Sequence, residues 1–346
     1  MRLINYRDAE YIGDIYLGGP VSQRATVVID TGSSWLNVKS CFNNGHCHKH
    51  DYQSKPEKDW PGHLKHYRRT VLRDKNNKNG VVYHMNKTKT GHFTDFKKNF
   101  DLSYGSADLN GGRNHDIVCL KPFPKSVKEI EDITPDIMHD NFCVKDIRFM
   151  TITESKGMET CDGILGVAPK SYAKHSFLQE LKTAGAIDQA LISFSNNFHK
   201  SSFLWNITGH TEKSYAIFGG INASQVIGGE EGIVTIPMAK GKLNPRFFWG
   251  VHGNGFAYGK TVLMDPENHK PYLAVIDSGT TLVILPWTAY ENFITALAEQ
   301  FRDDPDVDLV CERVNETNSM DHCYFNNTKC QEMVDNHGYK LGNIQF

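Results

Sequence analysis

Short runs of β-branched and aromatic residues, separated by Gly, Asn and Pro, recur along most of the chain. Runs of this kind are typical of β-strands bounded by turns. The pattern predicts strands at Tyr11–Leu17, Ala25–Ile29, Asp116–Leu120, Ile147–Ile152, Leu191–Phe194, Tyr215–Phe218, Ile233–Ile236 and Tyr272–Ile276. Helical spacing of apolar residues occurs at Ser176–Ala184 and, more clearly, at Trp287–Phe301. We therefore expect an all-β fold with minor helices.

The composition fits a globular protein that is large enough for two lobes. The chain has 346 residues, of which 39% are hydrophobic and 23% are charged. Its formal net charge of −2 gives no reason to expect a nucleic-acid partner. The apolar runs are far shorter than the ~18 residues of a membrane helix. The first residues lack the apolar core of a signal peptide, so no targeting segment is expected within this chain.

Eight cysteines and five Asn-x-Ser/Thr sequons favour an oxidising compartment, either secretory, lysosomal or vacuolar. Cys41 and Cys47 flank a turn-forming Asn-Asn-Gly, so a small disulfide loop fits there. The pairing of the other six stays open, and these are Cys119, Cys143, Cys161, Cys311, Cys323 and Cys330. The sequons, which are compatible with a glycoprotein, lie at Asn86, Asn206, Asn222, Asn315 and Asn326.

The stretch from Lys39 to Lys98 differs from the rest of the chain. It contains 14 Lys and Arg, 5 Asp and Glu, and 7 His. Its weak strand pattern predicts a basic, His-rich insertion in a surface loop, over about residues 42–98. The run from His46 to His50 could ligate a metal, and the basic run Lys65–Arg73 could contact a polyanion. A solvated loop is the simpler interpretation, and we expect neither a metal nor a cofactor.

One sequence pattern occurs twice, 247 residues apart. The first copy is Ala25-Thr-Val-Val-Ile-Asp30-Thr31-Gly32-Ser33-Ser34, and the second is Leu273-Ala-Val-Ile-Asp277-Ser278-Gly279-Thr280-Thr281. Each is an apolar strand that ends in Asp, a hydroxyl residue, Gly and two further hydroxyl residues. A single Asp-Thr-Gly is usually a turn. Two copies after matching strands suggest two related lobes that each offer one Asp to a shared cleft.

The chemistry available to such a pair is specific. Two carboxyl groups in contact cannot both ionise easily, so the pair holds one proton over a wide acidic range. The charged member can deprotonate a water, and the protonated member can polarise a substrate carbonyl. The resulting gem-diol collapses with cleavage of the amide, so neither a metal nor a covalent intermediate is needed.

The residues around each Asp suit that chemistry. The glycine of each motif permits a tight loop with close backbone approach. The first hydroxyl residues could hydrogen-bond across the junction of the lobes, and the next ones could donate to the carboxylates. These supporting residues are Thr31, Gly32, Ser33, Ser278, Gly279 and Thr280.

The motifs resemble those of the pepsin-like aspartic proteases, and the resemblance covers nearly the whole chain. Similar segments are Asn5–Gly13 (start of the mature enzyme), Phe100–Ser106 (flap hairpin), Asp162–Gly166 (apolar-apolar-Gly segment behind the first catalytic loop) and Ile217–Ile221 (strand near the lobe junction). Several branches of the family use the Asp-Ser-Gly-Thr-Thr form of the second motif. The resemblance implies a bilobal acid protease fold with the active cleft between the lobes.

By this resemblance Asp30 and Asp277 are the catalytic pair of an aspartic endopeptidase. The substrate-binding residues that it implies are Val28, Tyr104, Gly105, Ser106, Ile164 and Thr281, with Tyr104 as the flap residue. It also implies a Cys41–Cys47 disulfide and peptide or protein substrates with apolar residues around the scissile bond. A monomer that acts at acidic pH is expected.

The sequence departs from the family pattern in three places. Asn37 stands where a Trp is expected near the flap Tyr, so a different flap hydrogen bond is expected. The segment between Asp30 and Tyr104 is longer than in a compact pepsin. Only 69 residues follow Asp277, so the final strands of the second lobe are expected to be missing. We therefore expect an N-terminal lobe over 1–222, with the flap and insertion, and an incomplete C-terminal lobe over 223–346.

The sequence predicts an acid-acting aspartic endopeptidase. The alternative is a non-catalytic protein of the same fold that binds peptides or partners. The incomplete lobe favours this alternative, whereas the two intact Asp residues disfavour it. A third hypothesis is a metal- or polyanion-binding module centred on the His-rich insertion.

Overall fold

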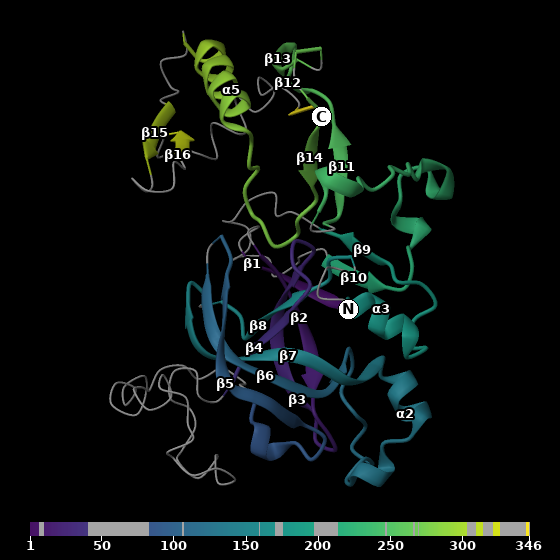
Figure 1. The fold of residues 1–346 in the computed structure, drawn as a ribbon. Helices are drawn as coiled ribbons and strands as arrows, with labels where there is room; N and C mark the ends of the chain where they lie inside the picture. The colour runs from purple at the N-terminus through teal and green to yellow at the C-terminus, as the bar shows by residue number, and fades with distance from the viewer. Residues whose placement is uncertain are drawn as a thin grey trace, which may run out of the picture. The chain divides into compact units, whose positions relative to one another are not determined.

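The computed structural model of the chain contains two compact units (Figure 1). Unit 1 consists of Met1–Ile236, Asn244–Trp249 and Val275–Thr281, and unit 2 consists of Pro237–Leu243, Gly250–Ala274 and Leu282–Phe346. The structure describes residues 1–6, 10–40, 83–105, 107–158, 160–169, 176–196, 214–245, 248–265, 267–268, 270–302, 309–313, 321–325 and 344–345. Both Asp-containing motifs belong to unit 1.

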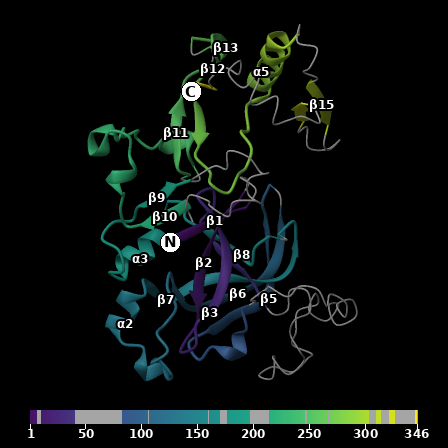
Figure 2. The ribbon, with the colours of Figure 1, turned by 180° about the vertical axis from the view of Figure 1, so that it is seen from behind.

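Unit 1 is built on one ten-stranded sheet. In spatial order its strands are β5 (His92–Ser103), β6 (Asp108–Cys119), β7 (Cys143–Lys156), β4 (Leu36–Lys39), β8 (Gly163–Gly166), β3 (Gln23–Asp30), β2 (Glu10–Leu17), β1 (Arg2–Tyr6), β10 (Ser214–Phe218) and β9 (Ile192–Ser195). Strand β6 also pairs with β2, so the sheet curls back on itself (Figure 2). Most pairs are antiparallel, but β3 runs parallel to β8 and β4 runs parallel to β7.

The alternation along β3 shows why this sequence forms a core strand. Ala25, Val27 and Ile29 are at most 1% exposed and pack into the largest apolar cluster of unit 1. Alternate side chains of a strand point to opposite faces, so the residues between them face the other way. Strand β8, whose four residues are all buried, lies against β3 with Asp30 opposite Gly166. The core of unit 1 therefore reaches up to the first Asp motif.

Helices are few and short in unit 1. Helix α2 (Pro135–Asp140) begins after Thr134, whose Oγ1 accepts a hydrogen bond from Ile137 N. Helix α3 (Phe177–Thr183) is held on the sheet by three buried apolar side chains. The 3₁₀ turns among the described residues of unit 1 are η4 (Met85–Lys87), η5 (Ile130–Asp132), η6 (Ala223–Gln225) and η7 (Gly229–Gly232).

Unit 2 has smaller sheets and one longer helix. Strands β11 (Gly250–Gly253) and β14 (Tyr272–Val275) form one pair, and β13 (Thr261–Met264), β12 (Phe256–Tyr258) and β17 (Ile344–Gln345) form a three-stranded sheet. Strands β15 (Leu309–Arg313) and β16 (Asp321–Phe325) form a hairpin, and η8 spans Gly241–Leu243. Helix α5 (Trp287–Gln300) packs Ala289 and Leu297 against β12 and β13. These contacts give unit 2 an apolar core of its own.

The predicted all-β class with minor helices is confirmed. Of the predicted strands, Ile233–Ile236 is wrong. This segment follows η7 and pairs with no described strand, and the exposed fractions of Ile233, Val234 and Ile236 are 40%, 83% and 64%. An apolar run resembles a strand in sequence, but it becomes one only where a neighbouring strand accepts its backbone hydrogen bonds.

The predicted insertion of about 42–98 extends too far at its C-terminal end, because strand β5 begins within it. Tyr83 is 1% exposed and its backbone bridges to Ser40, and β5 begins at His92. The described part of this range is thus attached to the sheet. The sequence of β5 lacks a clear apolar strand pattern. β5 lies at one edge of the sheet, where a strand can carry many polar residues.

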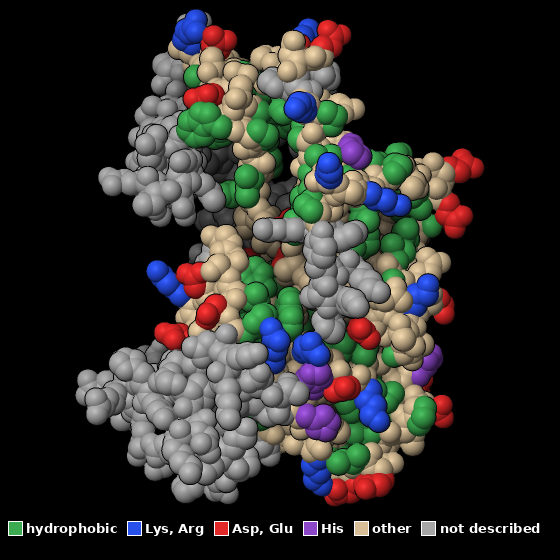
Figure 3. Space-filling view, viewed as in Figure 1, with side chains coloured by type: hydrophobic (Ala, Val, Ile, Leu, Met, Phe, Trp, Pro, Cys, Tyr) green, Lys and Arg blue, Asp and Glu red, His purple; other side chains and the backbone are tan. Residues whose placement is uncertain are grey.

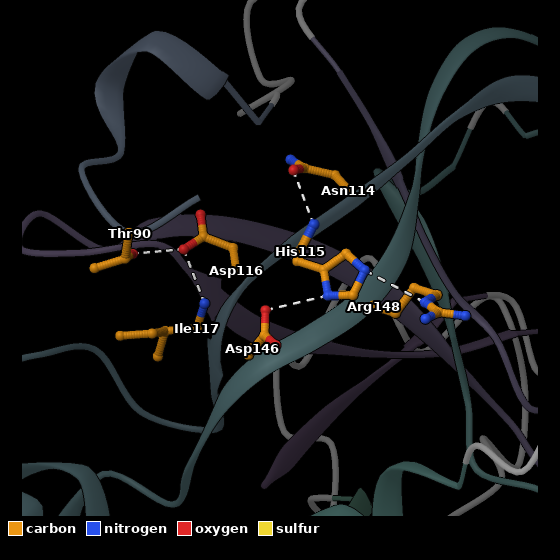
Figure 4. Close-up of polar contacts among 7 residues, drawn as sticks. All are labelled: Thr90, Asn114, His115, Asp116, Ile117, Asp146 and Arg148. Atoms are coloured by element: carbon orange, nitrogen blue, oxygen red, sulfur yellow. Dashed lines mark hydrogen bonds and ion pairs between the residues drawn. The ribbon is translucent and has the colours of Figure 1, made fainter. Parts of the chain in front are cut away.

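A disulfide and a polar network hold the C-terminal end of β6 and the N-terminal end of β7. Cys119 and Cys143 lie opposite each other and are bonded, which answers one of the open pairings. Figure 4 shows buried Asp116, whose Oδ1 accepts hydrogen bonds from Thr90 Oγ1 and Ile117 N. Its Oδ2 accepts one from Tyr83 Oη at 2.7 Å. This carboxylate therefore ties the segment before β5 to β6.

The described residues on one face of the molecule show no patch of a single charge sign (Figure 3). On the face drawn in Figure 3, basic, acidic and histidine side chains lie interspersed over the described part of the chain. One such group, also in Figure 4, joins His115 Nδ1 to Asp146 Oδ1 at 3.1 Å and His115 Nε2 to Arg148 Nε at 3.3 Å. Among the described helices, none is both long and apolar enough to cross a bilayer.

Candidate active site

The first Asp motif forms a tight, buried loop at the end of β3. Asp30 is the last residue of the strand, and it is 6% exposed. Gly32 N donates to Asp30 Oδ1 at 2.8 Å, and Ser33 Oγ donates to Oδ2 at 2.5 Å. The loop therefore supplies a donor to each oxygen of its own carboxyl group.

The last residue of β8 and the two residues after it fasten this loop from behind. The backbone N–H groups of residues 166–168 donate to the carbonyls of Trp35, Asp30 and Ser33 at 2.9, 2.8 and 2.8 Å. Gly166 is required here, because a Cβ at this position would lie 2.5 Å from Trp35 N. The apolar-apolar-Gly segment thus lies where the family resemblance placed it.

The second Asp motif repeats the local bonds in a more exposed setting. Gly279 N donates to Asp277 Oδ1 at 2.8 Å, and Thr280 Oγ1 donates to Oδ2 at 2.7 Å. Asp277 is half-buried, whereas Gly279 and Thr280 are exposed. The two motifs therefore share a conformation but differ in burial.

Reciprocal hydrogen bonds join the two loops. Thr31 Oγ1 donates to Ile276 O at 2.8 Å and accepts a bond from Ser278 N at 2.8 Å. In the mirrored pair, Ser278 Oγ donates to Ile29 O at 2.6 Å and accepts a bond from Thr31 N at 3.1 Å. The hydrogen bonds expected between these hydroxyl residues are present, and each hydroxyl group serves both as donor and as acceptor.

The two glycines bring the carboxyl groups together. A Cβ on Gly32 would lie 2.4 Å from Asp277 Oδ2, and a Cβ on Gly279 would lie 2.4 Å from Asp30 Oδ1. Each carboxyl group therefore occupies the space that a side chain on the other loop would fill. Only glycine allows this mutual approach at both positions.

The pKa of Asp30 is raised to about 6, chiefly because burial disfavours the charged carboxylate. The nearby charge of Asp277 and a hydrogen bond between the two carboxyl groups raise it further, while the donors Ser33 and Gly32 oppose the shift. Of the two groups, Asp30 is the more buried. The pair can therefore hold one proton at acidic pH.

The hairpin formed by β5 and β6 carries the predicted flap tyrosine. Its turn closes with a 2.7 Å bond from Tyr104 N to Ala107 O. Asn37 Nδ2 donates to Tyr104 Oη at 2.7 Å, so the amide holds the phenol from β4. Burial raises the pKa of Tyr104 to about 12. The residue that departs from the family pattern thus holds the predicted flap tyrosine from β4.

Apolar side chains surround this tyrosine. Val28, Phe100, Leu102 and Tyr104 pack against a buried cluster that contains Ile164. The structure thus brings together three of the predicted substrate-binding residues. Gly105 has open space where a Cβ would lie, and Thr281 is exposed on the second loop.

A cluster of tilted rings beside the predicted flap has no counterpart among the sequence predictions. The Trp35 and Phe100 rings lie 4.9 Å apart, and the Arg113 guanidinium lies 4.6 Å from the Phe100 centroid and 5.8 Å from that of Trp35. The strand pattern could have indicated that Arg113 faces the flap side of β6, but no sequence signal pairs it with these rings.

Several predicted features lie outside the described residues. They are Ser106, the Cys41–Cys47 pair, the His46–His50 run and the basic run Lys65–Arg73. Within the described residues no three His, Cys, Asp or Glu side chains are grouped in a way that could hold a metal ion.

Residues 10–344 match the family of eukaryotic aspartyl proteases. The chain belongs to this family. A crystal structure of the aspartic proteinase from Irpex lacteus superposes with a TM-score of 0.55 and 17% sequence identity, covering 90% of this chain and 71% of that one. This likeness shows that this family member has the pepsin-like fold.

Curated relatives of this aspartyl protease chain include two cathepsins. It is 26% identical to cathepsin E of Mus musculus over 284 residues, which are 82% of this chain and 56% of the relative. It is 24% identical to cathepsin D of Canis lupus familiaris over 317 residues, which are 90% of this chain and 64% of the relative. The chain thus spans less than two thirds of the length of either cathepsin.

Proposed function

We propose that this family member is an aspartic endopeptidase in which Asp30 and Asp277 share one proton. The observation that carries the proposal is the mutual approach of the two carboxyl groups at Gly32 and Gly279. The raised pKa of Asp30 supports it, because a carboxyl group that stays protonated at acidic pH can donate a hydrogen bond to a substrate carbonyl.

In the proposed reaction Asp277, as the charged and more exposed member, takes a proton from a water molecule. The water oxygen attacks the carbonyl carbon of the scissile amide, and protonated Asp30 gives its proton to the carbonyl oxygen. The gem-diol then collapses: the C–N bond breaks, and the leaving nitrogen receives the proton held by Asp277. A diol proton returns to Asp30, so the pair ends with one proton as it began.

The loop donors hold the pair for this exchange. Gly32 N and Ser33 Oγ keep the Asp30 carboxyl in one orientation, and Gly279 N and Thr280 Oγ1 do the same for Asp277. The Thr31 and Ser278 bonds fix one loop against the other. Groups held in place need little reorganisation during the reaction, which lowers its barrier.

The substrates that we propose are peptides with apolar residues at the scissile bond. The apolar cluster that contains Val28, Ile164 and Tyr104 supports this preference, because apolar side chains gain free energy when such a surface removes them from water. The Cys119–Cys143 disulfide supports a secretory or lysosomal location, where disulfides form and persist.

The alternative proposal is a protein of the same fold that binds peptides without cutting them. The exposure of Gly279 and Thr280 is the observation that favours it, because water around the second carboxyl weakens the electrostatic coupling of the pair. The endopeptidase is preferred, because all supporting bonds of both loops are in place.

The test is cleavage of a quenched fluorescent peptide with apolar residues at its centre, at pH 3.5 to 7. We expect turnover that declines as the pH rises through about 6, because Asp30 then loses the proton that it must donate. The Asp30→Asn and Asp277→Asn variants should each lose about 10²- to 10⁴-fold in kcat/KM. Peptide binding with no turnover by the parent chain would instead support the binding protein.

A further inference from the structure

Unit 1 contains a cavity of about 220 Å³ that the proposed reaction does not use. It is lined by residues of β4, β6, β7 and α3, and by Ser34 of the first Asp loop. An apolar cavity of about 150 Å³ is large enough to bind benzene. The cavity in unit 1 therefore has room for one small organic molecule.

Part of the cavity lining is apolar and buried. Leu36, Ile147 and Phe177 line it and are 4%, 7% and 4% exposed. All three belong to the main apolar cluster of unit 1, so their positions are fixed by the core. An apolar group that covers this part of the lining is removed from water, and that removal favours binding.

Two side chains of opposite charge line the same cavity. Glu180 comes from α3 and Arg148 from β7. Among the described residues, neither of them forms an ion pair, either with the other or with a third side chain. A molecule that carries one charge of each sign can pair with both, and each such charge-assisted hydrogen bond is stronger than a neutral one.

Hydrogen bonds of defined direction orient Arg148. Its Nε donates to His115 Nε2 at 3.3 Å (Figure 4). Because Nε2 accepts this bond, the proton of the neutral imidazole is on Nδ1, which donates to Asp146 Oδ1 at 3.1 Å. The two Nη groups of Arg148 take no part in this series. They are donors with which a guanidinium group binds a carboxylate.

The backbone at Asp146 is irregular where it meets the cavity. Asp146 has a φ of 63°, in the left-handed region that few residues other than glycine adopt. The register of β7 against β6 shifts opposite this residue, between Asp116 and Val118. Bulges re-aim side chains and are frequent beside functional sites. Here the irregular backbone carries the carboxylate that holds His115.

We propose that this cavity binds a free amino acid with an apolar side chain. The carboxylate of the amino acid pairs with the Nη groups of Arg148, and its ammonium group pairs with Glu180. Its side chain covers Leu36 and Phe177. Charges of both signs around a small apolar surface match this class of ligand better than a simple amine or a simple acid, each of which leaves one charge of the cavity unpaired.

The site lies next to the first Asp loop but apart from the carboxyl pair. Ser34 lines the cavity and directly follows Ser33, whose hydroxyl group donates to Asp30 Oδ2. A bound amino acid thus contacts the loop that holds the first carboxyl group. The inference does not rest on the proposed function, because binding can be measured whether or not the chain cleaves peptides.

The test is a titration of the whole chain at pH 7 with leucine, followed by calorimetry and by amide NMR shifts. We expect leucine to bind with a Kd of about 1 mM or lower, and to shift the amide signals of Ser34, His115 and Glu180. Leucinamide lacks the carboxylate and 4-methylpentanoate lacks the ammonium group. Each should bind at least about tenfold more weakly than leucine.

Glu180→Gln and its matched control locate the site. Glu180→Gln removes no hydrogen bond of the Glu180 carboxylate to another described residue, so its Tm should equal that of the parent, while its Kd for leucine should rise about tenfold or more. Glu154→Gln removes the same charge from an exposed position of β7 outside the cavity and should leave the Kd unchanged.

The outcomes separate this site from the carboxyl pair. Asp30→Asn should bind leucine like the parent, even though it is expected to lose turnover. No leucine binding at 10 mM, which is about ten times the expected Kd, would overturn the inference. Equal affinity for leucine and leucinamide, or equal Kd values for Glu180→Gln and Glu154→Gln, would also overturn it. Parental turnover in Asp30→Asn would overturn only the proposed function.

Discussion

The two Asp loops have nearly the same sequence and the same internal bonds, yet their surroundings differ. Three backbone N–H groups of residues 166–168 fasten the first loop from behind, and Leu165 beside it is fully buried. No strand of the described residues runs beside the second loop in this way, although Ile276 N donates to Trp249 O at 2.8 Å. Leu282, Val283 and Ile284, which follow the second loop, are 66%, 63% and 70% exposed.

The comparison teaches that a short motif fixes local conformation but not burial. The Asp-hydroxyl-Gly-hydroxyl pattern closes each loop through donors within four residues, so both copies form the same turn. Burial depends on segments far away in the sequence, and it is burial that raises the pKa of Asp30. The same loop conformation can therefore hold one carboxyl group that is buried and one that is half-exposed.

The largest difference between the loops should appear in stability. Leu165→Ala removes side-chain atoms from the core behind the first loop and should cost about 2–5 kcal/mol. The same change at exposed Leu282 should stay within about 0.5 kcal/mol. Urea unfolding of both variants measures these values. Equal losses would show that the two loops are buried alike.

The next largest loss of stability is expected from variants that remove the hydrogen bonds between the two loops. Thr31→Val leaves Ile276 O and Ser278 N without the Thr31 hydroxyl, and Ser278→Ala removes the hydroxyl that bonds Ile29 O and Thr31 N. Each change should cost about 1–3 kcal/mol, and the double variant should cost less than the sum. These losses are measured by thermal unfolding.

A matched control for this pair is Thr183→Val. The Thr183 hydroxyl donates to Gln179 O on the exposed face of α3, so its loss should be near zero. Additive losses in the Thr31 and Ser278 double variant would contradict a joint role for the two hydroxyl groups.

Much of this arrangement could be predicted from the sequence. Apolar alternation indicated β2, β3 and β7, and the repeated motif indicated that Asp30 and Asp277 belong together. The burial difference could not be predicted, because both motifs follow equally apolar strands. The bond from Asn37 to Tyr104 was also not predicted, since no local pattern says which strand faces the hairpin. Sequence periodicity specifies faces, but contacts between faces need the register of the whole sheet.

The smallest effect should come from the loop hydroxyl groups. Ser33→Ala removes a donor from buried Asp30, so the pKa of Asp30 should rise and the basic limb of kcat/KM should move to higher pH. Thr280→Val removes the equivalent donor from Asp277, where exposure to water replaces it, and should move the profile less. The pH dependence of kcat/KM for both variants checks this order. A larger shift for Thr280→Val would reverse the proposed assignment of the proton.

The most direct test of the shared proton is a ¹³C NMR titration of Asp30 in the parent chain and in Asp277→Asn. In the parent the carboxyl signal should titrate near pH 6. In Asp277→Asn it should titrate at lower pH, because the neighbouring charge is gone, but still above 3.8, because Asp30 remains buried. The account would be contradicted if Asp30 in the parent titrates like an exposed aspartate. It would also be contradicted if the titration of Asp30 is the same in Asp277→Asn as in the parent.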